Sequence, residues 1–212
     1  MGFGLQDILT KVLMLPGIMI ALSFHEFAHA WMSDKLGDPT PRRQGRLTLN
    51  PLAHIDWIGF ATLLIIGFGW GQPVQIDASY YKNKRRDEFL VGIAGVTMNL
   101  ILAVIFSIPV RIMRNYFMSG SGASAMMLQN VFLILLYAVM INLVLMIFNL
   151  IPCPPLDGFG ILTQIFKLDK YDWWYPLYQK GTIILLILIV TRMTGRIITP
   201  MVTILMNILV YR

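Results

Sequence analysis

The chain has 212 residues, of which 57% are hydrophobic and only 13% are charged. Soluble domains carry about 25% charged residues, so this composition excludes an ordinary soluble domain and predicts an integral membrane protein. The net charge of +6 is compatible with nucleic-acid binding, but the basic residues lie in loops beside apolar segments. That distribution is typical of membrane topology, so we expect a lipid bilayer as partner and no nucleic acid.

Long apolar runs predict the membrane-spanning helices. In chain order they cover about residues 8–31, 89–110 and 128–150. Each run approaches or exceeds the roughly 20 residues that cross a bilayer as a helix. A shorter apolar run at 182–190 leads into "IITPMVTILMNILV", and these two segments are either one broken span or two elements. The predicted fold class is an all-α polytopic membrane protein with a bundle of four to six transmembrane helices.

One apolar segment is too short to cross the membrane. The stretch "WIGFATLLIIGFGWGQPVQI" is apolar for only about a dozen residues before glycine and proline interrupt it. We therefore predict a short re-entrant β-hairpin or loop. Gly67, Gly69 and Gly71 lie in its 67–76 part, where an exposed edge could bind an extended substrate peptide by strand addition. The alternative is a glycine-rich loop packed under the bundle.

The basic loops predict the orientation of the chain. Residues 33–55 and 75–88 carry the heaviest basic load, so both are expected on the cytoplasmic side. They share a side only if the segment between them turns back without crossing. The first span then places residues 25–29 in its cytoplasmic half, and the third span brings "NLIPCPPLDG" to the same leaflet. We expect a multi-pass protein of the cell membrane with its site toward the cytoplasmic half.

The segment "SFHEFAHAWM" places ionisable residues inside the first predicted membrane helix. His25 and His29 are four positions apart, so their side chains lie one above the other on one helix face. Two imidazoles in this arrangement can bind one Zn²⁺, with Glu26 beside them as general base. Unpaired polar groups at this depth are costly, which favours a metal site over chance or over histidines that only pack between helices.

A hydrolytic zinc site needs three protein ligands and one open position for water. Asp157 is the candidate third ligand, because the predicted topology brings it to the leaflet of the histidines. Its neighbours in "PPLDG" can hold the backbone off helical geometry close to a metal. The alternative is an ordinary turn in which the aspartate caps the next helix. Cys153 is a competing ligand, because thiolates bind zinc well.

Two more polar residues are candidates. Asn149 ends the third span and could contact the oxyanion or the substrate; a helix cap or an interhelical hydrogen bond is the alternative. His54 lies in a loop, where a lone histidine is usually a surface or capping residue. It could instead approach the metal ligands or act as a reversible, regulatory extra ligand.

The paired motifs resemble the site-2 protease family of intramembrane zinc metalloproteases, peptidase family M50. The resembling residues are His25-Glu26-x-x-His29 and the stretch from Asn149 through Pro152 to Leu156-Asp157-Gly158. The resemblance implies that His25, His29 and Asp157 bind zinc and that Glu26 is catalytic. It also implies one Zn²⁺ per chain and a transmembrane or membrane-anchored protein as substrate.

Two further stretches are similar to this family. "GFGWGQPV" resembles its membrane re-entrant hairpin, and "GIAGVTMNL" resembles its Ala-Gly-Pro-x-x-Asn-Leu stretch, with Val96 where proline is usual. The chain looks like the small members without a PDZ domain. We therefore expect a single integral membrane metalloprotease domain over 1–212, with a core at 8–165 and C-terminal membrane segments at 176–211.

The predicted function is hydrolysis of peptide bonds in membrane-anchored substrates, within or beside the bilayer. One alternative is a membrane zinc transporter or channel, since His and Asp in membrane helices also mark ion paths. Transport has no general requirement for the H-E-x-x-H spacing. The other alternative is a catalytically silent membrane scaffold, which has no need of the intact Glu26 and Asp157.

Overall fold

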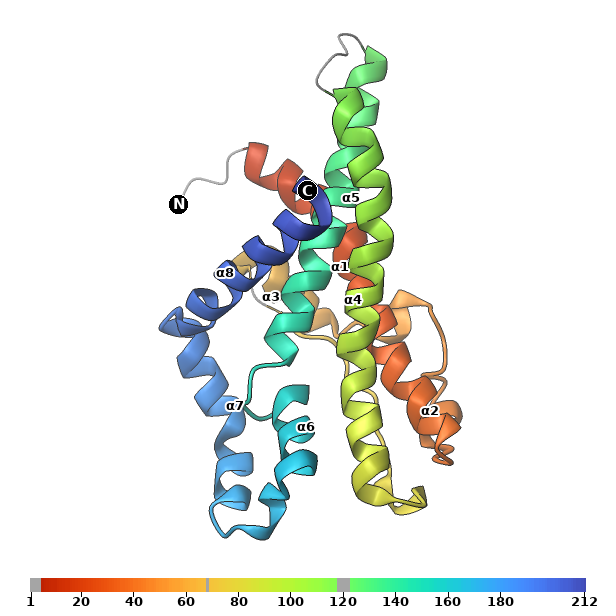
Figure 1. Ribbon diagram of the computed structural model, residues 1–212, viewed down its shortest axis with the longest axis vertical. Helices are drawn as coiled ribbons and strands as arrows, with labels where there is room; N and C mark the ends of the chain where they lie inside the picture. The colour runs from red at the N-terminus through yellow and green to blue at the C-terminus, as the bar shows by residue number, and fades with distance from the viewer. Residues whose placement is uncertain (1–4, 68, 118–122) are drawn as a thin grey trace.

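The structure, a computed structural model, describes residues 5–67, 69–117 and 123–212 (Figure 1). The described residues form helices and loops and contain no β-strand. The α-helices are α1 (Leu5–Lys35), α2 (Thr40–Arg43), α3 (Trp57–Ile66), α4 (Lys84–Phe117), α5 (Ala123–Asn149), α6 (Asp157–Phe166), α7 (Trp174–Val190) and α8 (Met193–Met206). Three 3-10 turns, η1 (Pro51–Ala53), η2 (Ala78–Tyr80) and η3 (Leu168–Lys170), lie between them, and a π-helical turn, η4 (Asn207–Tyr211), continues α8.

Four helices in the described part of the chain are long and apolar enough to cross a membrane. They cover Gln6–Lys35, Lys84–Arg114, Met127–Asn149 and Met193–Tyr211. The prediction of an all-α integral membrane protein is confirmed, at the lower end of the predicted number of spans. The two C-terminal segments are separate helices, because the backbone at Arg192 takes the left-handed conformation, with φ at 59°, between α7 and α8.

The helices α1, α4 and α5 pack against one another; α4 and α5 run side by side, and α1 crosses them (Figure 1). Lipid tails are as apolar as leucine, so close packing rather than the hydrophobic effect must hold such helices together. Gly17 of α1 permits this packing, since a Cβ there would lie 3.0 Å from the Cα of Ala138 on α5. Large apolar side chains instead cover the outer face of α4, among them Ile105 and Ile112, which are suited to contact lipid.

The β-hairpin part of the prediction for the segment after residue 56 is wrong for the described residues. The apolar run forms α3, which is capped by the Asp56 carboxylate through the Gly59 N–H at 2.8 Å. It ends at Gly67, whose φ of 85° is the left-handed conformation that closes many helices. A cap at each end of an unbroken apolar run favours a helix over paired strands. Its ten residues span about 15 Å, half of the hydrocarbon core.

The loop after α3 turns back onto α1 and onto the preceding loop. Gly71 forms an isolated antiparallel bridge with Ile55, and the N–H of Gln72 donates to the carbonyl of His54 at 2.9 Å. A Cβ at Gly71 would lie 2.8 Å from a methyl group of Leu22 on α1, so the loop packs closely on that side chain. The returning loop is thereby held beside the helix that carries His25, Glu26 and His29.

The end of α5 and the start of α6 bring the second predicted motif to the same region. In Figure 1, α6 and the N-terminal end of α4 lie in the lower part of the view. The C-terminal end of α4 and the N-terminal end of α5 lie at the top. The bundle therefore places residues from opposite halves of the chain around one cavity.

Candidate active site

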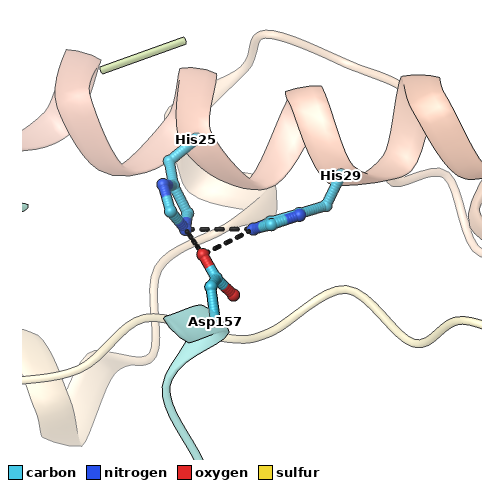
Figure 2. Close-up of side chains that lie close together, drawn as sticks. All are labelled: His25, His29 and Asp157. Atoms are coloured by element: carbon cyan, nitrogen blue, oxygen red, sulfur yellow. Dashed lines mark hydrogen bonds and ion pairs between the residues drawn. The ribbon is translucent and has the colours of Figure 1, made fainter. Parts of the chain in front are cut away.

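Three ligand atoms from α1 and α6 converge at one point (Figure 2). The Nε2 atoms of His25 and His29 lie 3.0 Å apart, and each lies 3.3 Å from Oδ2 of Asp157. In a tetrahedral zinc site with bonds of about 2.0–2.1 Å, neighbouring ligand atoms are about 3.3 Å apart. The three side chains therefore have the spacing of a catalytic zinc site with one position left open.

The hydrogen bond of His29 fixes which of its ring nitrogens presents an unprotonated lone pair toward Asp157. Nδ1 of His29 lies 2.8 Å from the carbonyl oxygen of Val91 on α4. A carbonyl only accepts, so Nδ1 carries the proton and donates it. The neutral ring then presents an unprotonated Nε2, the form that binds metals.

Two buried asparagines, Asn99 and Asn142, fix the protonated ring nitrogen of His25 in the same way. Both amide hydrogens of Asn99 are used, by the carbonyl of Ala21 at 3.1 Å and by Oδ1 of Asn142 at 3.0 Å. Asn142 in turn donates to the carbonyl of Ala138 at 2.8 Å. Oδ1 of Asn99 therefore faces His25 and accepts its Nδ1–H at 2.7 Å. Both histidines thus direct an unprotonated Nε2 to the same point.

The convergence of these atoms fits a bound cation. Oδ2 of Asp157 is buried and has no hydrogen-bond partner. Two nitrogen lone pairs and a carboxylate oxygen at about 3 Å from one another repel unless a positive charge lies between them. Two imidazoles and one carboxylate form the ligand set of hydrolytic zinc enzymes. Among the described residues, no other group of three metal-binding side chains comes together in this way.

Asp157 is placed by a tight turn rather than by helix capping. It is the first residue of α6, and the N-cap position belongs to Leu156. Asp157 is therefore not the N-cap residue that the alternative interpretation expected. Gly158 packs directly on the carbonyls of Leu150 and Ile151, where a Cβ would overlap the backbone. The competing ligand Cys153 does not join the cluster. Its thiol points instead toward the carbonyls of Pro154 and Gly181.

Close approach of α4 to the histidines requires Gly95. A Cβ at this position would overlap Nε2 of His29 and lie 2.6 Å from the His25 ring. Gly95, Asn99 and Asn142 were not among the candidate residues predicted from the sequence. The two asparagines could have been recognised as polar residues within apolar runs, because a buried asparagine in a membrane span is costly unless its amide is fully hydrogen-bonded.

Glu26 lies in the same cavity as the cluster of His25, His29 and Asp157. The cavity has a volume of about 510 Å³, and its lining includes His25, Glu26, His29 and Asp157. The N–H of Val74, in the loop that follows α3, donates to Oε2 of Glu26 at 2.9 Å. This bond fixes one carboxylate oxygen and leaves the other available to a reactant. Nothing in the local sequence pattern predicts this contact.

A buried carboxylate anchors the segment that carries Val74. Asp38 is fully buried and accepts hydrogen bonds from the N–H of Thr40, the N–H of Asp77 and the hydroxyl of Ser33. Burial opposes its ionisation, but these hydrogen bonds keep the pKa of Asp38 below its usual value. The hydroxyl of Tyr81, which also lines the cavity, donates to Ser33 at 2.7 Å. Burial raises the pKa of Tyr81 to about 12, so this donor stays protonated at neutral pH.

Of the two remaining polar candidates, Asn149 lines the cavity and His54 does not. The amide of Asn149 donates to the carbonyl of Leu145 at 3.0 Å. His54 is fully buried at the end of η1 rather than on the surface. Its Nε2 lies 2.8 Å from the carbonyl of Thr48. It belongs neither to the cluster of His25, His29 and Asp157 nor to the cavity lining.

Gly67, Gly69 and Gly71 shape the loop without lining the cavity. Gly67 ends α3, Gly69 packs against Gly59, and Gly71 packs against α1. The part of the loop that reaches the cavity is residues 73–76. If a substrate docks on this loop, its contacts are therefore expected C-terminal to the three glycines.

The asparagine chain gives a first test of the site. Asn99→Leu removes the acceptor of the His25 Nδ1–H, so zinc affinity is expected to fall about 10- to 100-fold. Competition with a fluorescent chelator on the purified protein measures this affinity. Ser107→Ala is the matched control, because Ser107 is also a buried polar residue of α4 and its hydroxyl donates to the carbonyl of Val104 in its own helix. Equal affinities for the two variants would contradict the assigned role of Asn99.

The fold and the site together define a polytopic membrane protein with a buried cluster of two histidines and one aspartate and an adjacent glutamate. Comparison with known proteins gives the same class. Residues 107–188 match Peptidase family M50, a range that includes Asp157 but not the histidines.

Similar proteins cover most of the chain. "Putative zinc metalloprotease YwhC" of Bacillus subtilis is 37% identical over 184 residues, which are 87% of this chain and 83% of that protein. "Putative zinc metalloprotease Rip2" of Mycolicibacterium smegmatis is 27% identical over 195 residues, 87% of this chain and 69% of that protein. The protein of the same name from Mycobacterium tuberculosis is 27% identical over 183 residues, 84% of this chain and 66% of that protein. No solved structure matches significantly.

The chain belongs to peptidase family M50. It is an integral membrane metalloprotease, and zinc is its cofactor.

Proposed function

We propose that this enzyme hydrolyses peptide bonds of transmembrane or membrane-anchored proteins within or beside the bilayer. In this proposal His25, His29 and Asp157 hold one zinc ion and Glu26 is the general base. The observation that carries it is the convergence of three ligand atoms, two from a membrane helix, in the cavity that also contains Glu26. The whole chain acts as one catalytic domain.

The side chains divide the chemistry among them. A bound zinc ion supplies Lewis-acid activation of water and of the scissile carbonyl. Glu26 takes a proton from the attacking water through the carboxylate oxygen that Val74 leaves free, and later gives it to the leaving amine. Asn149 uses one amide hydrogen within its own helix, so the second can donate to the developing oxyanion.

A helical substrate must unwind before attack, because its amides are hydrogen-bonded within the helix. The loop at residues 73–76 borders the cavity next to Glu26, and in our proposal it receives the unwound peptide by backbone pairing. Gly67, Gly69 and Gly71 set the shape of this loop. His54, which supports the loop through its carbonyl and Gln72, influences turnover only through that packing.

The proposed orientation places the active site in the cytoplasmic half of the cell membrane. The basic cluster at the start of α4 and the arginines of α2 lie toward the end of the bundle that also holds α6 (Figure 1). By the positive-inside rule this end faces the cytoplasm. Cleavage products would then be released on the cytoplasmic side.

Metal removal tests the proposed function directly. The purified enzyme in liposomes is expected to lose cleavage of a model membrane-anchored protein after treatment with 1,10-phenanthroline, and to regain it with one equivalent of Zn²⁺. Adding Mg²⁺ is the control, since Mg²⁺ prefers oxygen ligands and octahedral geometry. Undiminished cleavage by protein shown to contain no metal would refute the proposal.

A further inference from the structure

Glu88 is a charged residue of the cavity wall that the proposed hydrolysis does not use. The acidic residues that line the cavity are Glu26, Glu88 and Asp157, and no lysine or arginine of the described chain joins them in its lining. Glu26 and Asp157 already have roles in the proposed reaction. The chain as a whole carries a net charge of +6, so an acidic cavity differs in sign from the rest of the protein.

The position of Glu88 on α4 sets its distance from His25 and His29. It precedes Gly95, which packs against both imidazoles, by seven residues on α4. At 1.5 Å per residue, this separation is about 10 Å along the helix. An extended peptide advances about 3.3 Å per residue, so a substrate side chain opposite Glu88 would be about three residues from the scissile bond.

The Glu88 carboxylate remains accessible to a ligand. Gln164 of α6 donates to Oε2, and Nζ of Lys84 lies 3.9 Å from Oε1. The Lys84 side chain is 73% exposed, and such surface pairs are weak. Arg85 is used elsewhere, because it pairs with Asp169 and donates to two carbonyls of α6. A cationic group entering from the cavity can therefore take the place of Lys84.

An aromatic cluster from α6 and α7 lines the same cavity. The rings of Phe159 and Trp174 have centroids 6.2 Å apart, and those of Trp174 and Tyr178 are 5.3 Å apart. The indole N–H of Trp174 donates to the hydroxyl of Thr163 at 3.0 Å, which holds the ring in place. Such a wall suits the apolar stem of a lysine or arginine, and aromatic rings also attract its cationic head.

We propose that Glu88 and the aromatic cluster form a subsite of the cavity for a lysine or arginine side chain of the substrate, about three residues from the scissile bond. Glu88 binds the cationic head, and the aromatic cluster packs against the stem. The proposal rests on the proposed function and specifies the substrate class. A membrane-anchored substrate carries such residues where it leaves the membrane toward the cytoplasm, which is the level at which α4 begins.

Binding can be measured without cleavage in the Glu26→Gln enzyme in zwitterionic nanodiscs. The probes are model transmembrane peptides of identical apolar sequence whose cytoplasmic flank carries lysine, glutamine or glutamate. With Glu88 present, the lysine peptide is expected to bind about five- to tenfold more tightly than the glutamine peptide. Glu88→Gln should abolish this preference, and Glu88→Lys should reverse it in favour of the glutamate peptide. A reversal cannot result from unfolding.

Asp172→Asn is the matched control, because Asp172 is an exposed carboxylate outside the cavity lining and its loss makes the same change in charge. This variant should keep the preference for lysine. A lysine preference that survives in Glu88→Gln, or equal binding of all three peptides to the enzyme with Glu88 intact, would overturn the subsite. Zinc-dependent cleavage without a flank preference would overturn the subsite alone and leave the proposed function standing.

Discussion

Glu26→Gln is expected to lower kcat by about 10²- to 10⁴-fold while the zinc content stays at one per chain. Glutamine has the size and shape of glutamate and can still accept the N–H of Val74, so the loop at residues 73–76 should stay in place. It cannot accept a proton from water at neutral pH. Metal analysis and cleavage of a model substrate by the same preparation separate the two properties.

The control for this variant is Asp7→Asn, which removes an exposed carboxylate from the same helix, α1. It should leave both zinc content and kcat unchanged. Cleavage by purified Glu26→Gln protein at the wild-type rate would remove Glu26 from the chemistry. Loss of zinc together with activity would assign Glu26 to metal binding instead.

Replacement of a proposed metal ligand should have the opposite pattern, with zinc and activity lost together. Zinc binding by four ligands contributes about 10–16 kcal/mol, or about 3 kcal/mol per ligand. His29→Ala and Asp157→Asn are therefore each expected to weaken zinc binding by more than about 100-fold. Zinc content after dialysis against a chelator of known affinity gives the measurement.

Cys153→Ala is the informative control for the ligand variants. Cys153 lies four residues before Asp157, but its thiol points toward Pro154 and Gly181. The Cys153→Ala variant should retain zinc and activity. Zinc loss in Cys153→Ala with retention in Asp157→Asn would show that the thiolate, not the carboxylate, completes the site.

The spans and the histidine motif could be predicted from the sequence because each depends on local pattern. A long apolar run needs only its own length to be recognised as a membrane helix. The spacing of His25 and His29 fixes their common face wherever α1 lies. Asp157 required one further step, since only the topology of the intervening spans suggested that a residue so far along the chain returns to the histidines.

The features that the sequence did not predict depend on contacts between distant segments. Whether the run after residue 56 forms a helix or a hairpin depends on caps at Asp56 and Gly67 that glycine-rich patterns obscure. The bond from Val74 to Glu26 depends on how far the returning loop reaches. Asn99 was visible within a family-like stretch, but its role follows only from its contact with His25 across two helices.

X-ray absorption spectroscopy at the zinc edge tests the central claim most directly. The zinc-loaded enzyme is expected to show nitrogen and oxygen neighbours at about 2.0–2.1 Å, with the outer-shell scattering of two imidazoles, and His29→Ala protein should not retain this signal. A sulfur neighbour at about 2.3 Å, or a spectrum without imidazole scattering, would contradict a site built from His25, His29 and Asp157.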